Sequence, residues 1–145
     1  MSEILYFAYG SNLNIPQMKD RCPDAVGVSA AVLNGWQLKE RTFADIEPAP
    51  GKCVHGALYK ISADDLASLD FYEGYPEFYD RVEVSVVDSK GDSRSAWVYT
   101  MTAKYKDRRS DRPYSDQYRA VCSEGAESWG IPNAFELKDN KEERR

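Results

Sequence analysis

Histidine and cysteine are scarce in this chain, and their scarcity limits the chemistry that the sequence can support. The 145 residues include one histidine, His55, and three cysteines, Cys22, Cys53 and Cys122, with no C-x-x-C pair. Zinc sites usually combine several such ligands, and a catalytic serine or cysteine usually needs a partner base. The sequence therefore predicts no metal site. It favours a structural or surface role for His55 and reduced cysteines that act as small core residues.

The sequence also lacks a glycine-rich phosphate loop, a long basic run and a long hydrophobic run. Without a P-loop or a G-x-G-x-x-G motif, phosphoryl and hydride chemistry are poorly supported. The formal net charge of -5 disfavours binding to nucleic acid. The densest basic stretch, Lys104–Arg112, is interrupted by aspartates. It is interpreted as a solvated loop, with an anion-binding patch as the alternative.

No stretch approaches the ~18 apolar residues of a membrane span, and no signal peptide is recognisable at the N-terminus. With reduced cysteines, this pattern leads us to expect a cytoplasmic protein without a membrane segment. The length suits a single domain, which we place at residues 1–137, followed by a polar tail at residues 138–145. A domain of this size buries roughly 70% of its unfolded surface, so it needs no metal or disulfide.

Hydrophobic alternation and turn signals predict an antiparallel sheet. The expected strands are Glu3–Tyr9, Val26–Leu33, Trp36–Arg41, Cys53–Ile61, Arg81–Asp88 and Ser95–Met101. Asn34-Gly35 predicts a hairpin turn, and Phe43–Gly51 is expected to be a loop that contains prolines. Gly56 suggests a bulge or a close approach of two backbones. The predicted class is α+β, a small and mostly antiparallel, partly closed β-barrel with inserted helices.

Capping signals predict two longer helices and one short helix. Ser62–Tyr72 begins with a capping-box pattern, in which an aspartate follows Ser62 after three residues, and it ends before Gly74. A second helix is expected from an N-cap at Ser115 to about residue 129, and a short one over Pro16–Arg21.

With metal, phosphoryl and hydride chemistry poorly supported, acid–base chemistry by a carboxylate remains. Glu73 is the strongest candidate, because it lies in the last turn of the helix that ends before Gly74. The negative end of the helix dipole disfavours an ionised carboxylate there, and neighbouring aromatic residues would add desolvation. Both effects raise the pKa toward neutrality, where a glutamate can take and return protons. The alternative is an exposed glutamate that ends the helix by chance.

The stretch YFAYGSNL ends an aromatic strand with Gly10, Ser11 and Asn12. Gly10 could simply supply a positive φ for a turn. Alternatively, successive N–H groups at the strand end could form a nest for a substrate carboxylate or carbonyl oxygen, with the Ser11 hydroxyl and Asn12 amide beside it. Tyr118, near the start of the late helix, could contribute a phenol to the same pocket or be an ordinary core tyrosine.

These motifs resemble the gamma-glutamylcyclotransferase family. Y-G-S-N-L follows an N-terminal aromatic strand, and L-D-x-x-E-G follows some sixty residues later. The segments Arg81–Met101 and Pro113–Pro132 are also similar to that family, so the resemblance spans residues 4 to about 132. It implies the fold of the family, and an enzyme that releases 5-oxoproline from a gamma-glutamyl amide without a cofactor.

The resemblance also implies roles for individual residues. Glu73, the glutamate of the E-G pair, would act as general acid and base in the attack of the substrate's own alpha-amine. The implied substrate-binding residues are Tyr6, Phe7, Ala8, Tyr9, Gly10, Ser11 and Tyr118. The partner is then a small gamma-glutamyl molecule.

The resemblance leaves the leaving group open. The stretch EGYPEFY, with Arg81 after it, is closer to the AIG2-like branch, but the lysine-adduct members of that branch tend to have Y-G-T-L where this chain has Y-G-S-N. Tyr79 is a further candidate for the pocket. A binding module that senses a small acidic metabolite is the alternative function, and exposed tyrosines make a homodimer possible.

Overall fold

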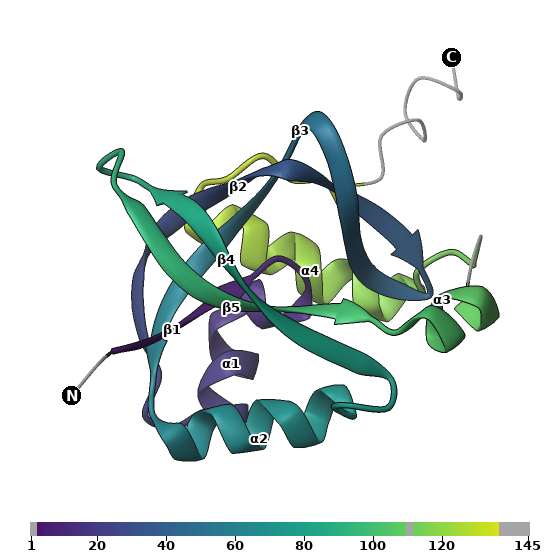
Figure 1. The fold of residues 1–145 in the computed structure, drawn as a ribbon, viewed down its shortest axis with the longest axis horizontal. Helices are drawn as coiled ribbons and strands as arrows, with labels where there is room; N and C mark the ends of the chain where they lie inside the picture. The colour runs from purple at the N-terminus through teal and green to yellow at the C-terminus, as the bar shows by residue number, and fades with distance from the viewer. Residues whose placement is uncertain (1–2, 110–111, 137–145) are drawn as a thin grey trace.

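Five strands of the computed structural model close into a barrel within the described residues, 3–109 and 112–136 (Figure 1). They are β1 (Ile4–Ala8), β2 (Val26–Arg41), β3 (Phe43–Ile61), β4 (Tyr79–Asp88) and β5 (Ser93–Met101). Their order around the barrel is β1-β3-β2-β4-β5. The predicted α+β barrel is confirmed, and the predicted polar tail lies outside the described residues.

Most strand pairs are antiparallel, and one parallel pair closes the barrel. β1 pairs with β3, β3 with β2, β2 with β4 and β4 with β5 in antiparallel fashion. β1 and β5 run parallel and meet at Tyr6 and Trp97. Closure pairs the edge strands with each other, which removes the open edges of the sheet. The fully buried side chains include Phe7, Leu58 and Val98.

Helices connect the strands and cover the barrel. They are η1 (Ser11–Leu13, a 3-10 turn), α1 (Ile15–Arg21), α2 (Ala63–Glu73), α3 (Ala103–Arg109) and α4 (Asp116–Trp129). In Figure 1, α2 runs along the lower side of the barrel and α4 lies on the far side. The sequence predicted α1, α2 and α4 but not α3, which occupies part of the basic stretch that we expected to be a loop. None of the helices in the described residues has the length and hydrophobicity that crossing a membrane requires.

The predicted capping of α2 is confirmed, and it fixes where this helix ends. The Ser62 hydroxyl accepts the N–H of Asp65 at 3.0 Å, and the Asp65 carboxylate accepts the N–H of Ser62 at 3.2 Å. At the other end, Gly74 adopts φ 73° and its N–H bonds to the last turn. This left-handed residue stops the helix directly after Glu73.

The predicted hairpin at Asn34-Gly35 is wrong. β2 continues through this pair, and its register against β3 shifts there from Asn34 opposite Cys53 to Trp36 opposite Pro48. Gly35 has φ 87°, so the positive φ that favours a hairpin turn here forms an irregularity within a long strand. The two strands predicted at residues 26–33 and 36–41 are therefore one.

The turn between β2 and β3 lies at Thr42 instead, which has φ 65°. Arg41 and Phe43 pair directly on either side of it. The expected loop Phe43–Gly51 is therefore part of β3, and its Ile46 is fully buried. Burial of such side chains against the core outweighs the low strand preference of the prolines in this segment.

Gly56 confirms the predicted close approach of two backbones. A Cβ atom at this position would collide with the carbonyl oxygen of Ala8 and with the ring of Phe7. β1 and β3 can pack at this point only because residue 56 has no side chain.

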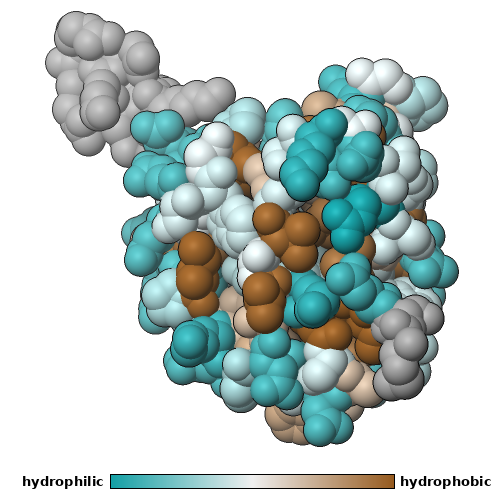
Figure 2. Space-filling model, turned by 90° about the vertical axis from the view of Figure 1, so that its left-hand side faces the viewer, coloured by the Kyte–Doolittle hydropathy of each residue, from teal (hydrophilic) through white to brown (hydrophobic). Residues whose placement is uncertain are grey.

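On the face shown in Figure 2, hydrophobic residues form several patches that are separated by hydrophilic ones. Scattered apolar residues are usual on the surface of a globular protein. This face therefore adds no support for the homodimer, which stays a prediction.

Candidate active site

A cavity of about 580 Å³ lies where the turn after β1, the C-terminal end of α2 and the start of α4 come together. Its lining combines polar groups with several aromatic rings. Phe71, Tyr72 and Phe78 belong to the lining and are also solvent-exposed, so they form the rim. A concave site with a few polar groups among apolar side chains is typical of small-molecule binding.

Most residues predicted for the site line this cavity. They are Tyr6, Tyr9, Gly10, Ser11, Glu73 and Tyr118, joined by the further candidate Tyr79. Phe7 and Ala8 do not line it, since both are completely buried and pack beside Gly56. Consecutive strand residues point to opposite sides, so Phe7 faces the barrel core while its neighbour Tyr6 faces the cavity.

Glu73 ends α2 with a half-buried side chain in the cavity wall. Desolvation by burial raises the pKa of its carboxyl to about 7, and the charge of Arg21 opposes this effect. Burial is therefore the main cause of the raised pKa that the sequence predicted. A group with this pKa is present in both protonation states near neutral pH, as a general acid and base requires.

Five phenols lie within electrostatic reach of Glu73. The pKa of each phenol is raised by burial as the largest cause, and the charge of Glu73 contributes in every case. These residues are Tyr6, Tyr9, Tyr79, Tyr99 and Tyr118. Their hydroxyls stay protonated at neutral pH, so the Glu73 carboxylate is surrounded by neutral phenols.

Hydrogen bonds hold several of these phenols in place. The Tyr118 hydroxyl accepts the N–H of Ala44 at 3.0 Å, and the Tyr79 hydroxyl donates to the carbonyl of Ala44 at 3.1 Å. The Tyr9 hydroxyl donates to the carbonyl of Tyr99 at 2.8 Å. The start of β3 therefore anchors side chains from β4 and α4, and the wall of the cavity is fixed before any ligand binds.

Gly10 provides space and not a positive φ, because its φ is -123°. A Cβ atom at this position would lie 3.0 Å from the Tyr118 hydroxyl and 3.1 Å from the Cβ of Ala44. The alternative that Gly10 serves a left-handed turn is therefore wrong. The next residues open the η1 turn, so the N–H groups of Ser11 and Asn12 have no acceptor within that turn.

Asn12 is a buried connecting residue and not an exposed polar group. Its Nδ2 donates to the Tyr6 hydroxyl at 3.0 Å. Its Oδ1 accepts from Gln17 at 3.2 Å and from Arg21 at 3.1 Å, and its carbonyl accepts from the Tyr59 hydroxyl at 3.1 Å. These bonds join the turn after β1 to α1 and to the barrel.

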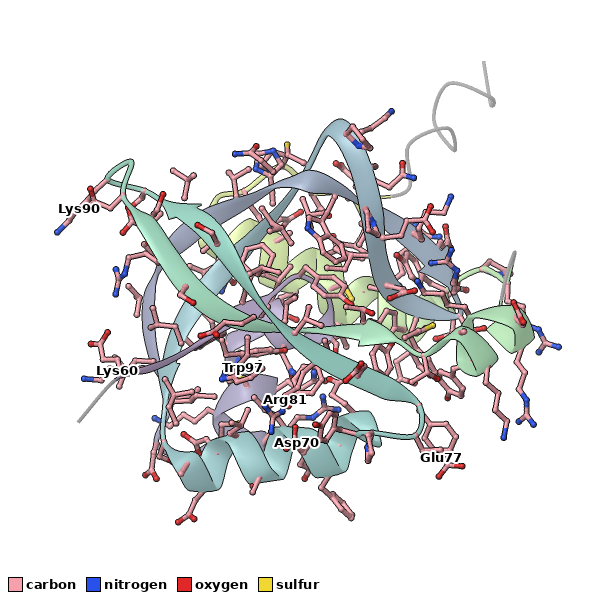
Figure 3. All side chains as sticks on the ribbon, in the orientation of Figure 1. Lys60, Asp70, Glu77, Arg81, Lys90 and Trp97 are labelled. Atoms are coloured by element: carbon pink, nitrogen blue, oxygen red, sulfur yellow. The ribbon has the colours of Figure 1, made fainter. Side chains whose placement is uncertain are left out.

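A second group of polar contacts holds the end of α2 against the barrel (Figure 3). The Asp70 carboxylate accepts two hydrogen bonds from Arg81, at 2.8 and 3.1 Å, and a third from the Tyr99 hydroxyl at 2.7 Å. The Arg81 guanidinium stacks over Tyr75 and Trp97, at 4.7 and 4.5 Å from the ring centroids. Because these contacts fix the turn that precedes Glu73, they also orient its side chain.

No role was predicted for Asp70 from the sequence, and Arg81 was expected only as the first residue of a strand. The three-residue spacing from Asp70 to Glu73, which places both on one helix face, was the available signal for Asp70. Arg21 and Gln17 were missed because a polar residue in a short helix is usually solvated. Only the tertiary structure brings these two residues to the cavity.

Comparisons with known proteins identify the family of the chain. The family described as gamma-glutamyl cyclotransferase, AIG2-like, matches residues 6–120, which is most of the chain. The chain belongs to this family. The resemblance carried by Y-G-S-N-L and the E-G pair is thereby confirmed.

Curated relatives and solved structures extend the match. A bovine gamma-glutamylcyclotransferase is 34% identical to this chain. The alignment is 149 residues long and covers 94% of this chain and 77% of the relative. A rat gamma-glutamylaminecyclotransferase is 33% identical over 78 residues, which cover 49% of this chain and 52% of the relative.

Among solved structures, a gamma-glutamyl cyclotransferase superposes with a TM-score of 0.78 at 29% identity, covering 95% of this chain and 90% of that one. A human protein solved as uncharacterized superposes with a TM-score of 0.82 at 30% identity, covering 96% and 91%. The barrel is thus a fold that members of the family share.

Proposed function

We propose that the protein is a gamma-glutamylcyclotransferase that converts a gamma-glutamyl amino acid or amine to 5-oxoproline and the free amine. The observation that carries this proposal is the half-buried Glu73, with a pKa of about 7, in the wall of the cavity that the turn after β1 also lines. The family membership supports the reaction class. The reaction needs no water and no cofactor, because the substrate supplies both the nucleophile and the leaving group.

In the proposed reaction the Glu73 carboxylate takes a proton from the alpha-ammonium of the substrate. The freed amine attacks the gamma-carbonyl carbon, so a C–N bond forms and the ring closes. Glu73 returns this proton to the leaving nitrogen, and the bond from the carbon to that nitrogen breaks. The second proton of the attacking nitrogen also passes through Glu73 to the departing amine, so the products are the neutral lactam of 5-oxoproline and the amine as its ammonium ion. Well-oriented intramolecular attack reaches effective molarities of about 10⁵–10⁸ M, so the enzyme mainly has to hold the substrate folded.

The developing oxyanion needs hydrogen-bond donors, and the cavity contains several. The N–H groups of Ser11 and Asn12 have no acceptor in the η1 turn, and neutral phenols such as Tyr118 line the same cavity. One well-placed donor stabilises such a transition state by about 3–4 kcal/mol. We propose that the turn after β1 binds the glutamyl part and that Tyr6, Tyr9 and Tyr118 complete the binding site.

A gamma-glutamyl amino acid is our first choice of substrate, and a gamma-glutamyl amine is the second. The bovine relative named gamma-glutamylcyclotransferase aligns with 94% of the chain, whereas the rat gamma-glutamylaminecyclotransferase aligns with 49%. Reduced cysteines suit a cytoplasmic enzyme, and its partner would be this small molecule.

The test is a 5-oxoproline assay with gamma-glutamyl dipeptides, glutathione, gamma-glutamyl-lysine and gamma-glutamyl-ethylamine. Glu73→Gln should keep the fold and abolish turnover, because the amide cannot accept the proton. Glu77→Gln is the matched control, since Glu77 is an exposed carboxylate four residues later. The absence of product from every substrate would reject the activity. A normal rate with Glu73→Gln would remove Glu73 from the reaction.

A further inference from the structure

Arg21 is the one basic side chain among the described residues that line the cavity. It is the last residue of α1 and is half-buried. The cavity therefore contains one guanidinium and one carboxyl, Glu73, among neutral groups.

Two neutral groups hold the Arg21 guanidinium. Its Nη1 donates to the Oδ1 of Asn12 at 3.1 Å, and its Cζ lies 4.7 Å from the centroid of the Tyr72 ring. Asn12 is itself buried and fixed by further hydrogen bonds. An amide and an aromatic ring orient the guanidinium without cancelling its charge. Within the part of the chain that the structure describes, one of its five N–H groups has a hydrogen-bond partner, so four can bind another acceptor.

No carboxylate of the described residues forms an ion pair with Arg21, although seven other ion pairs are present in that part of the chain. The charge of Arg21 acts on Glu73 nevertheless, because it lowers the pKa of that carboxyl against the effect of burial. Both side chains line the same cavity and form no ion pair with each other. An ammonium beside Glu73 and a carboxylate beside Arg21 would complete the charge balance of the cavity, and an amino acid carries both groups.

We propose that Arg21 binds a carboxylate of the substrate and makes the enzyme selective for substrates that carry it. This inference rests on the proposed function. Two carboxylates fit the same chemistry: the alpha-carboxylate of the glutamyl part, and the carboxylate of a leaving amino acid. The planar guanidinium can form two parallel hydrogen bonds to either one, which a lysine cannot reproduce.

The test combines substitutions of Arg21 with substrates that lack one carboxylate. The substrates are gamma-glutamyl-alanine, gamma-glutamyl-ethylamine without the leaving-group carboxylate, and 4-aminobutanoyl-alanine without the alpha-carboxylate. The variants are Arg21→Gln and Arg21→Lys, with Lys19→Gln as the matched control, because Lys19 is an exposed cation on the same helix outside the cavity. Rates are compared on the alkaline plateau of each variant, where a change in the pKa of Glu73 has no effect.

For gamma-glutamyl-alanine, Arg21→Gln should lower kcat/KM by about 10- to 100-fold, chiefly through KM, since a hydrogen-bonded charge is lost. Arg21→Lys should recover part of the loss, and Lys19→Gln should match the wild type. If Arg21 binds the leaving-group carboxylate, gamma-glutamyl-ethylamine will not respond to Arg21→Gln. If it binds the alpha-carboxylate, 4-aminobutanoyl-alanine will not respond. Equal losses with all three substrates, or losses below threefold, would overturn the proposal.

A binding measurement separates this inference from the proposed reaction. Calorimetry with gamma-glutamyl-alanine on Glu73→Gln, with and without Arg21→Gln, reports carboxylate binding without turnover. A weaker affinity in the double variant supports the role of Arg21 even if the wild type forms no 5-oxoproline. Equal affinities overturn it even if the enzyme is active. If thermal unfolding shows that Arg21→Gln is not folded, Arg21→Lys replaces it. The kcat/KM values of Arg21→Lys and of the wild type are then compared among the three substrates.

Discussion

Glu73→Gln should stabilise the folded protein above neutral pH while it abolishes turnover. Burial raises the pKa of the Glu73 carboxyl from 4.5 to about 7. The unfolded chain therefore ionises at a lower pH than the folded one, and stability falls as the pH rises from about 4.5 to about 7. At 1.36 kcal/mol per pH unit this amounts to about 3 kcal/mol, and solvent at the cavity mouth reduces it to about 1–3 kcal/mol.

A glutamine has the same shape and no charge, so its contribution to stability should not change over this range. Urea unfolding followed by tryptophan fluorescence at pH 4.5 and pH 8 measures the difference. The two proteins should be similar at pH 4.5, and the variant should be more stable at pH 8. Glu77→Gln keeps Glu73, so its stability should fall between pH 4.5 and pH 8 by the same amount as that of the wild type. If the stability gap between Glu73→Gln and the wild type is the same at both pH values, the carboxylate is not desolvated and the reasoning fails.

Three further predictions follow from the same geometry. The kcat/KM for 5-oxoproline formation should rise with pH around an apparent pKa of about 7, because Glu73 must be ionised to take a proton. A pH profile that is flat from pH 5 to 9 would contradict this role. Asp70→Asn should lower the free energy of unfolding, measured by urea titration, by about 1–3 kcal/mol, because it weakens the hydrogen bonds to Arg81 and Tyr99. It should also lower kcat, and an unchanged kcat would mean that the contacts of Asp70 do not orient Glu73. Gly56→Ala should destabilise the barrel by about 1–3 kcal/mol or more, because the added methyl group would collide with the backbone of β1. This loss is measured as a lower Tm. An unchanged Tm would show that β1 and β3 can move apart without loss of stability.

The Asn34-Gly35 pair illustrates why some local signals mislead. The pair favours a positive φ, and Gly35 has one, but the same conformation serves a hairpin turn and an irregularity in a continuous strand. Which of the two forms depends on the residues that follow. Ala44 and Ile46 are buried when the chain after Thr42 pairs back along β2. That pairing is a long-range contact, so no local pattern around Asn34 could predict it.

In the candidate site, too, local signals predict some residues, whereas others depend on long-range contacts. Glu73 could be predicted because a capping box and a C-terminal glycine place it at a helix end, and both are short-range features. Arg21 could not, because it is held by Asn12 and Tyr72, which belong to different parts of the fold. Phe7 and Ala8 were included because their motif is continuous in sequence, whereas both side chains are completely buried beside Gly56.

The sequence by itself determined the α+β class and the ends of α2 and α4, and it led to the proposal of a carboxylate as the reacting group. These follow from hydrophobic period, capping and the scarcity of histidine, which act over a few residues. Only the tertiary structure decided the continuous β2, the buried Asn12, the contacts around Asp70, and the meeting of Arg21 with Glu73 in one cavity. The physical reason is that burial and charge depend on all the groups that surround a side chain, and barrel closure brings those groups together from distant parts of the chain.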